Sequence, residues 1–507
     1  MKKVVVHSDQ DKGIINPELH SHFIEFLGSC IYDGIWVGEE SEIPNYGGLR
    51  KDVVDALKEL EPPVIRWPGG CYADTYHWKK GIGSRKERPV TYNENFGTFE
   101  RDTNQFGTHE FMELCRMVGA KPWLNVNMMS GSVEEMREWM EYCNRGEETE
   151  LSLRREANGS REAFWVEYWG IGNEVWGGGG TMTAEGYAAQ YRKYATAVPS
   201  FAKPGELGKS YMKRIACGPD GNKPRERVRW TKDFFRELSR YRMPAIEGYD
   251  LHFYNWNLNP LEESEVEFGE KEWSQVIRGA LELEEVIREQ YDLLQKCLAE
   301  IPQGEDFFAG KEKKVDLIVG EWGNWHGASF KSRPALYQQC TMRDAVTTAL
   351  TLDIFHHNCD KVKMACVAQS INVLNSLILT DGSKCIRTPN YDVFQMYKVH
   401  RGARALSVTE DCGDDVYVFC SEKDGVINVN LVNAAYSGYR EVHLDLQMET
   451  VCIQAFMLKG DEPTACNTFD NPDRVRAGET EFPVGSGNSY NISLPAASVS
   501  VFRFRIR

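Results

Sequence analysis

The hydrophobic positions between about residues 20 and 385 follow two patterns that alternate along the chain. Short apolar runs rich in β-branched residues are separated by longer stretches in which apolar residues recur at helical spacing. One such stretch begins at Thr108, carries Phe111, Leu114, Cys115 and Val118 on one face, and ends at Gly119. This alternation predicts repeated β-α units, which are typical of α/β proteins.

Eight of the apolar runs are candidate strands. They span residues 21–27, 64–67, 122–126, 166–171, 215–217, 249–254, 315–319 and 362–366. Their number and the helices between them predict a (β/α)8 TIM barrel, because a doubly wound sheet would more often show a glycine-rich phosphate loop after its first strand. The acidic segment 258–310 is the clearest insertion, and we expect a helix within it.

After about Arg387 the pattern changes to strict alternation. Val442, Leu444 and Leu446 alternate with polar residues, and Phe502, Phe504 and Ile506 do the same near the end of the chain. This pattern predicts an additional all-β sandwich domain. We expect the barrel to span residues 18–386, and the jelly-roll-like sandwich to combine residues 387–507 with 1–17.

Composition excludes several classes of partner. The 507 residues carry 59 Lys and Arg against 75 Asp and Glu, which gives a net charge of −16. Nucleic acid and anionic membrane surfaces are therefore not expected as partners. The apolar run near Met1 is too short for a signal peptide, and the 14 cysteines show no Cys-x-x-Cys pair, so we expect a cytoplasmic protein with reduced thiols.

Two candidate strands end at a glutamate that lies among glycine and tryptophan residues. The fourth runs into Asn173-Glu174, and the seventh ends at Glu321. Cleavage of a glycosidic bond needs one carboxylic acid to protonate the leaving oxygen and one carboxylate to meet the oxocarbenium carbon. A single strand-terminal glutamate is more often a solvated carboxylate, but two matched contexts in one barrel favour a catalytic pair, roughly 5 Å apart as in retaining enzymes.

Other polar residues interrupt apolar strands and are candidate binding residues. Glu25 and Arg66 are charged residues in apolar runs, which predicts either a buried Glu25–Arg66 ion pair or direct contact with sugar hydroxyls. His252 and Tyr254 lie on the sixth strand, where a core histidine is the default interpretation but the neighbouring polar and aromatic residues favour the site. Cys71 follows a glycine pair and, taken alone, is best interpreted as a small core residue.

No motif points to a metal or a cofactor. The chain has no His-Glu-x-x-His motif, no Cys/His cluster with zinc spacing, no Walker-type loop and no G-x-S-x-G elbow. We therefore expect neither a catalytic metal nor a cofactor.

Several segments resemble the α-L-arabinofuranosidases of glycoside hydrolase family 51. The matching segments are 22–25 (HFIE), 66–74 (RWPGGCYAD), 76–83 (YHWKKGIG), 106–111 (FGTHEF), 169–174 (WGIGNE) and 321–323 (EWG). Six motifs in the family's order make chance a poor explanation. The resemblance implies a (β/α)8 barrel with a β-sandwich, an intracellular location and a homohexamer.

The resemblance also implies roles for single residues. Glu174 would be the general acid/base and Glu321 the nucleophile, while Asn173 would donate a hydrogen bond to the 2-hydroxyl of the sugar. The remaining residues would hold the furanose ring or lie beside it; these are Glu25, Arg66, Cys71, His252, Tyr254 and Trp325. An arabinose-containing oligosaccharide is the implied substrate.

Three departures from the family pattern concern specificity. Phe96 stands where many members have a tryptophan, and Arg387 stands about where some members have a glutamine that touches the sugar. Met128 and Met129 replace small residues, which predicts a narrower cleft. These changes leave the mechanism alone and bear on substrate preference.

The sequence thus favours a retaining, exo-acting α-L-arabinofuranosidase. An endo-β-glycanase with the same glutamate pair is the first alternative, but it needs an open groove, whereas the 258–310 insertion and the two methionines indicate a closed pocket. A catalytically silent sugar-binding protein is the second alternative, and it would normally have lost one of the two carboxylates.

Overall fold

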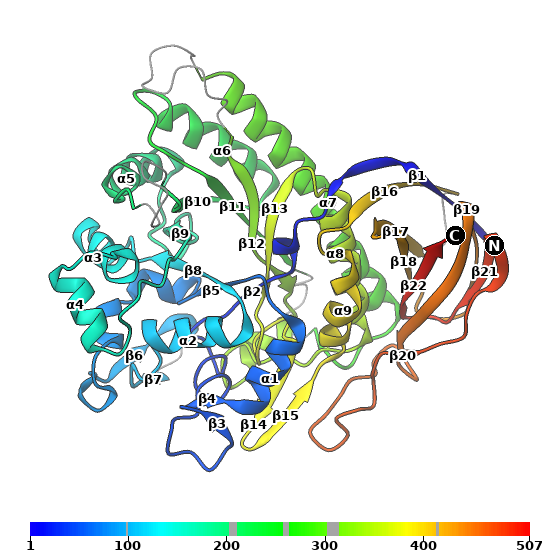
Figure 1. Cartoon of the computed structure of the whole chain (residues 1–507), viewed down its shortest axis with the longest axis horizontal. Helices are drawn as coiled ribbons and strands as arrows, with labels where there is room; N and C mark the ends of the chain where they lie inside the picture. The colour runs from blue at the N-terminus through cyan, green and yellow to red at the C-terminus, as the bar shows by residue number, and fades with distance from the viewer. Residues whose placement is uncertain (98–99, 202–209, 257–262, 302–313, 412–414) are drawn as a thin grey trace. The chain divides into compact units, whose positions relative to one another are not determined.

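The computed structural model describes residues 1–97, 100–201, 210–256, 263–301, 314–411 and 415–507 (Figure 1). Eight strands pair into a closed barrel, in the order β10-β11-β12-β13-β2-β5-β8-β9. Their bounds are β2 (Ser21–Phe23), β5 (Val64–Trp67), β8 (Lys121–Val126), β9 (Tyr168–Ile171), β10 (Lys213–Asp220), β11 (Gly248–Asn255), β12 (Asp316–Asn324) and β13 (Val362–Ala368). All eight predicted strands are therefore confirmed, and the fold is the predicted TIM-type barrel.

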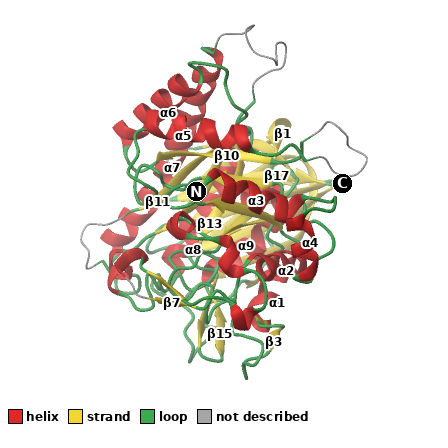
Figure 2. Cartoon of the chain, turned by 90° about the vertical axis from the view of Figure 1, so that its left-hand side faces the viewer, coloured by secondary structure: helices red, strands yellow, loops and turns green. Residues whose placement is uncertain are grey.

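Helices separate the barrel strands along the chain. They are α1 (Lys51–Leu60), α2 (Thr108–Val118), α3 (Val133–Asn144), α4 (Glu150–Ala157), α5 (Ala184–Ala197), α6 (Pro224–Leu238), α7 (Glu270–Ala299), α8 (Met342–His357) and α9 (Pro389–Tyr397). Helices α5 and α6 lie side by side in both views (Figure 1, Figure 2). Helix α7 confirms the helix expected in the 258–310 segment, both ends of which extend beyond the described residues.

Local sequence explains where these elements begin and end. Helix α2 buries Phe111, Leu114 and Cys115 and ends at Gly119, whose φ of 76° lies in the left-handed region that glycine tolerates. Strand β8 follows at once and pairs in parallel with β5 and β9. Of the helices in the described part of the chain, none is both long enough and apolar enough to span a bilayer.

The second architecture is a mostly antiparallel sheet, which confirms the predicted all-β domain. Its strands are β1 (Lys2–Ile14), β16 (Arg404–Glu410), β17 (Val416–Lys423), β18 (Val426–Asn433), β19 (Arg440–Lys459), β20 (Gly478–Glu479), β21 (Val484–Leu494) and β22 (Ser498–Ile506). Strand β1 pairs antiparallel with β16 and parallel with β19, so six strands close into a ring. Alternate residues such as Val4, Val442 and Phe504 fill its core.

Short hairpins form further two-stranded sheets in the described chain. They are formed by β3 (Asn45–Tyr46) with β4 (Leu49–Arg50), β6 (Thr91–Asn93) with β7 (Glu100–Asp102), and β14 (Ile378–Asp381) with β15 (Lys384–Arg387).

Internal contacts divide the chain into two compact units. One comprises Met1–Ser21, Tyr254–Ile287 and Trp322–Arg507, and the other comprises His22–Phe253 and Arg288–Glu321. The predicted domain division at residues 17/18 and 386/387 stays a prediction. The second unit contains the carboxyl ends of β5, β9 and β10 and the residues of β11 and β12 that form the site described next.

Candidate active site

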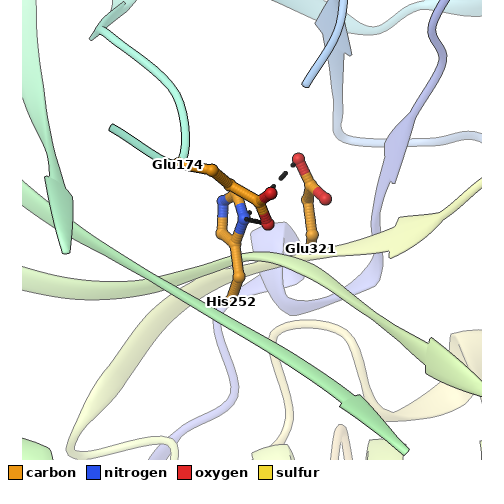
Figure 3. Close-up of side chains that lie close together, drawn as sticks. All are labelled: Glu174, His252 and Glu321. Carbon is orange, nitrogen blue, oxygen red and sulfur yellow. Dashed lines mark hydrogen bonds and ion pairs between the residues drawn. The ribbon is translucent and has the colours of Figure 1, made fainter. Parts of the chain in front are cut away.

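Glu174, His252 and Glu321 converge at the carboxyl ends of three barrel strands (Figure 3). Glu174 follows β9 with a φ of 38°, while His252 and Glu321 lie on β11 and β12. An oxygen of each glutamate and a ring nitrogen of His252 all lie within 4.8 Å of one another. The two glutamates that the sequence predicted as a pair are thus brought together.

The imidazole of His252 lies between carboxylates. Nδ1 is 2.9 Å from Oε1 of Glu174 and 3.6 Å from Oε1 of Glu321, while Nε2 is 3.1 Å from Oδ2 of Asp250. Burial alone would lower the pKa of His252, but the negative charges of Glu321 and Asp250 outweigh it and raise that pKa well above its usual value. Sequence reasoning missed Asp250, although strand alternation puts it on the same face as His252.

Burial also raises the pKa of Glu174. The hydrogen bond with His252 opposes this shift, and the nearby charge of Glu321 reinforces it. A carboxyl group with a raised pKa retains its proton to higher pH, which is the property that a general acid at neutral pH needs.

Arg66 joins the end of β5 to both glutamate-bearing segments. Its Nη1 donates to Oε1 of Glu321 at 2.6 Å, and its Nη2 donates to Oδ1 of Asn173 at 2.5 Å. Arg66 is completely buried, and its charge also lowers the pKa of Glu25. Arg66 thus forms an ion pair with Glu321, while the predicted Glu25–Arg66 ion pair and the direct contact with sugar hydroxyls stay predictions.

Glu25 is buried beside a glycine pair. Its Oε1 accepts a hydrogen bond from the backbone N–H of Tyr72 at 2.9 Å. A Cβ atom at Gly70 would lie 3.0 Å from Oε1 of Glu321 and 3.1 Å from Oε1 of Glu25, so a larger residue would crowd both carboxylates. Burial, followed by the charge of Glu321, raises the pKa of Glu25 to about 8.

Two further residues near these carboxyl groups come from the segment after β5. Sγ of Cys71 lies 3.9 Å from Oε2 of Glu174, so Cys71 is at the site rather than a distant core residue. Asp74 is 1% exposed, and neither of its carboxylate oxygens has a hydrogen-bond partner among the described residues. Burial raises the pKa of both groups. Sequence reasoning missed Asp74, because its segment offers no periodic signal.

The other compact unit holds an aromatic cluster. The rings of Tyr254 and Trp325 are 5.1 Å apart, and Trp325 also contacts Trp256 at 4.5 Å and Phe330 at 5.2 Å. Trp256 keeps 39% of its surface exposed. Tyr254 and Trp325 were predicted site residues, whereas Trp256 and Phe330 were not among them. Flat apolar rings of this kind suit packing against sugar rings.

The three departures from the family pattern have different environments. Phe96 is 43% exposed in a short 3-10 turn (Asn95–Gly97), with a φ of 56°. Arg387 ends β15 and stacks its guanidinium on Tyr391 at 4.6 Å. Met128 is buried, and its sulfur would lie 3.0 Å from a Cβ atom at Gly172, whereas Met129 is 47% exposed.

The three ligand-type atoms of Glu174, His252 and Glu321 form a group compact enough to hold a metal ion. Each of the three residues also has a protein partner: Glu174 and His252 bond to each other, and Glu321 bonds to Arg66. The same arrangement provides a pair of carboxyl groups and a proton in the hydrogen bond between Glu174 and His252. Acid–base and nucleophilic catalysis on a glycoside requires such groups.

Comparisons with known proteins agree with this geometry. A family model described as "Alpha-L-arabinofuranosidase 1 domain" matches residues 56–271, and one described as "Alpha-L-arabinofuranosidase C-terminal domain" matches residues 320–498. The chain is 37% identical over 516 residues to an "Intracellular exo-alpha-L-arabinofuranosidase" of Bacteroides ovatus, with 98% of this chain and 94% of that protein covered.

Solved structures give the same result. The crystal structure of a GH51 arabinofuranosidase from Xanthomonas axonopodis pv. citri superimposes with a TM-score of 0.89 at 33% identity, and 100% of each chain is covered. An α-L-arabinofuranosidase from Thermotoga maritima, solved as an arabinose complex, superimposes with a TM-score of 0.82 at 25% identity, again over 100% of both chains.

Proposed function

Because the chain belongs to the α-L-arabinofuranosidases of glycoside hydrolase family 51, we propose that it removes terminal L-arabinofuranose with retention of configuration. The proposed substrates are arabino-oligosaccharides or arabinoxylan fragments, attacked from the non-reducing end. One observation carries the proposal: carboxylate oxygens of Glu174 and Glu321 lie within 4.8 Å of each other. Retaining glycosidases hold their carboxyl groups about 5–5.5 Å apart, whereas inverting enzymes leave a wider gap for water.

In the first step, Glu321 is the nucleophile. Its carboxylate forms a bond to the anomeric carbon while the bond from that carbon to the leaving oxygen breaks. Glu174 gives its proton to the leaving oxygen, so the aglycone departs as a neutral alcohol. The raised pKa of Glu174 supports its role as the acid, and the Arg66 guanidinium that bonds Glu321 supports an ionised nucleophile.

In the second step, water releases the sugar. Glu174, now ionised, removes a proton from a water molecule as the oxygen of that water bonds to the anomeric carbon. The ester bond to Glu321 breaks at the same time, which regenerates its carboxylate. Two inversions at one carbon give net retention of configuration.

The remaining predicted residues are proposed to bind the furanose ring. Glu25, Cys71 and Asn173 offer polar groups to the sugar hydroxyls, and their positions around the glutamate pair support this role. Arg66 and His252 hold the two glutamates and are proposed to contact the ring as well. Tyr254 and Trp325 are proposed to pack beside it, and Phe96 and Arg387 to set substrate preference.

We also propose a cytoplasmic homohexamer, as the family resemblance implies. The printed name of the Bacteroides ovatus relative describes that protein as intracellular, which supports the proposed location. Light scattering on the purified protein tests the assembly, for which we expect six times the chain mass of 57.9 kDa.

The first test is hydrolysis of a panel of 4-nitrophenyl glycosides. We expect strong preference for the α-L-arabinofuranoside over the β-D-xyloside and the β-D-glucoside. Activity confined to polymeric β-glucan or xylan would instead favour an endo-β-glycanase. No hydrolysis of any substrate would favour a sugar-binding protein.

The second test separates the roles of the two glutamates. Glu321→Ala is expected to lose turnover of all substrates, because no nucleophile remains. Glu174→Ala is expected to keep the glycosylation step for good leaving groups and to be rescued by azide, giving a glycosyl azide of retained configuration. Near wild-type rates for Glu321→Ala would show that the nucleophile is assigned wrongly.

A further inference from the structure

Asp250 contacts the catalytic machinery at two points. Its Oδ2 lies 3.1 Å from Nε2 of His252, on the side of the imidazole opposite Glu174. Its Oδ1 accepts a hydrogen bond from the backbone N–H of Gly320 at 2.7 Å, directly before Glu321 in the chain. One carboxylate therefore connects the histidine that bonds Glu174 to the strand that carries Glu321.

The absence of a side chain at Gly320 makes this contact possible. A Cβ atom there would lie 2.3 Å from Oδ1 of Asp250, closer than real contacts of Cβ atoms. Asp250 is itself buried, with 6% of its surface exposed. The glycine thus leaves room for this carboxylate, which forms no covalent bond in either step of the proposed reaction.

The contact with Asp250 decides which nitrogen of His252 carries a proton. A carboxylate accepts hydrogen bonds and cannot donate them, so Nε2 must hold a proton to bond Asp250. Nδ1 then has two states. It either donates its own proton to an ionised Glu174, or accepts the proton of a neutral Glu174 as a bare nitrogen.

We propose that Asp250 is a positioning residue that keeps the proton of His252 on Nε2, so that Nδ1 can share one proton with Glu174. The pair gives this shared proton to the leaving oxygen in the first step and regains one from the attacking water in the second. This inference rests on the proposed function, because it assigns Asp250 a part in the proton transfer of the arabinofuranosidase reaction.

Several charged groups act on the same imidazole. Besides Asp250 on β11, they are Glu174 after β9, Asp220 at the end of β10 and Glu321 on β12, while Arg66 on β5 bonds Glu321. Asp220 influences His252 through its charge, and its Oδ1 accepts a hydrogen bond from the N–H of Asn222 at 2.9 Å. Asp220 therefore provides a matched control for charge.

The variant Asp250→Asn tests the tautomer. Its Oδ1 can still accept from the N–H of Gly320, so the amide NH2 takes the place of Oδ2 and donates to Nε2. Neutral His252 must then carry its proton on Nδ1, where it can no longer accept from a protonated Glu174. The variant keeps the size and shape of the side chain, so strand packing is preserved.

The kinetic readout is kcat/KM on two substrates, which reports the first chemical step. The natural alcohol of an arabino-oligosaccharide needs protonation on leaving, whereas 4-nitrophenolate does not. We expect Asp250→Asn to lower kcat/KM for the oligosaccharide by on the order of 100-fold, and by less than about 10-fold for the 4-nitrophenyl glycoside. Asp220→Asn is expected to lower both values by similar, small factors.

Equal losses on both substrates would overturn the inference, because they would indicate a general disturbance of the site. An Asp220→Asn variant with the same selective loss would also overturn it. A wild-type protein that is inactive on both substrates would contradict the proposed function instead, so the two failures are distinguishable.

A measurement independent of activity uses protein labelled with 15N-histidine. At a pH above the raised pKa of His252, we expect the neutral imidazole of the wild type, identified by its absence in His252→Gln, to carry its proton on Nε2. In Asp250→Asn the proton is expected on Nδ1. If neutral His252 in the wild type carries its proton on Nδ1, the inference is wrong, whether or not the variant folds.

Discussion

The carboxyl groups at the centre of the barrel differ in the partner that stabilises each of them. Glu321 has a guanidinium at 2.6 Å, Glu174 has an imidazole at 2.9 Å, and Glu25 accepts from a backbone N–H at 2.9 Å. At Glu25, burial and the nearby charge of Glu321 outweigh the backbone donor and the charge of Arg66, so the ionised form of Glu25 is disfavoured.

This difference predicts a change in stability with pH. The pKa of Glu25 is about 8 in the folded protein and near 4.5 when the chain is unfolded. Between these values the folded protein holds a proton that the unfolded chain releases, so the contribution of Glu25 to stability is full below 4.5 and is lost as the pH rises through 8. Glu25→Gln does not titrate and is expected to have a rising melting temperature relative to wild type across this window.

Thermal denaturation at pH 5, 6.5 and 8.5 measures the effect. The exposed Glu94→Gln provides the control, and its difference from wild type is expected to stay constant. Glu25→Gln should also lose activity, because its carboxylate is proposed to bind the sugar. A melting-temperature difference that does not change with pH would contradict the raised pKa.

At the residue scale, the sequence identified the central pair and most of the groups around it. Glu174 and Glu321 stand out because each follows an apolar strand among glycines. The partner of Arg66 could not be predicted, since its bond to Glu321 joins residues 255 positions apart, and only the closed barrel brings them together. Asp250 was within reach, because it lies two residues before His252 on the same strand.

At the scale of single elements, β11 and β12 are held in register by a side chain as well as by their backbones. Gly320→Ala would push a methyl group to 2.3 Å from Oδ1 of Asp250. We expect a loss of stability of about 1–3 kcal/mol from overpacking, together with a fall in kcat as Asp250 moves away from His252.

Urea unfolding and steady-state kinetics measure these two effects. Gly146→Ala is a suitable control, because a Cβ atom there would meet Cη2 of Trp165 at 4.0 Å, an ordinary contact. Wild-type activity in Gly320→Ala would show that β12 shifts without cost and that the position of Asp250 is not critical.

Element boundaries were predicted less well than element types. The strand expected at residues 21–27 ends at Phe23, although the N–H groups of Ile24 and Phe26 still donate to the carbonyls of Arg66 and Pro68. The seventh strand was expected to end at Val319 but continues to Asn324, past Glu321. Both differences occur at the site, where local sequence pattern competes with long-range hydrogen bonds.

At the scale of the whole molecule, α8 lies between barrel strands β12 and β13 in sequence but contacts strands of the all-β sheet. Every residue from Met342 to His356 is buried, and α8 contacts β17, β18 and β22. A helix that is covered on all sides cannot be stable in water without its neighbours.

Removal of residues 387–507 is therefore expected to give an insoluble or aggregated protein rather than an active barrel. It would expose the face of α8 that contacts the sheet and leave β1 without both of its partner strands. Solubility after expression and size-exclusion chromatography measure the outcome, with the full chain prepared in parallel. A soluble and active truncated chain would show that the sheet contributes little to folding.

The sequence correctly predicted a barrel and an all-β part. The spacing of hydrophobic residues changes near residue 387, from alternating strand and helix patterns to strict alternation of apolar and polar residues. It also predicted that residues 1–17, which contain β1, join the all-β part. The closure of that sheet by parallel pairing of β1 with β19 was not predicted, since it joins Lys2 to Val442 and no local pattern encodes such a distant pairing.

The crowding of acidic groups around the imidazole also changes what the site offers to a hydroxyl group. Burial raises the pKa of Glu25, Asp74 and Glu174, so these carboxyl groups hold protons to higher pH than free ones. A protonated carboxyl group donates one hydrogen bond and still accepts others, whereas an ionised one only accepts. A hydroxyl group is likewise both donor and acceptor, so the buried, protonated acids match it in both directions.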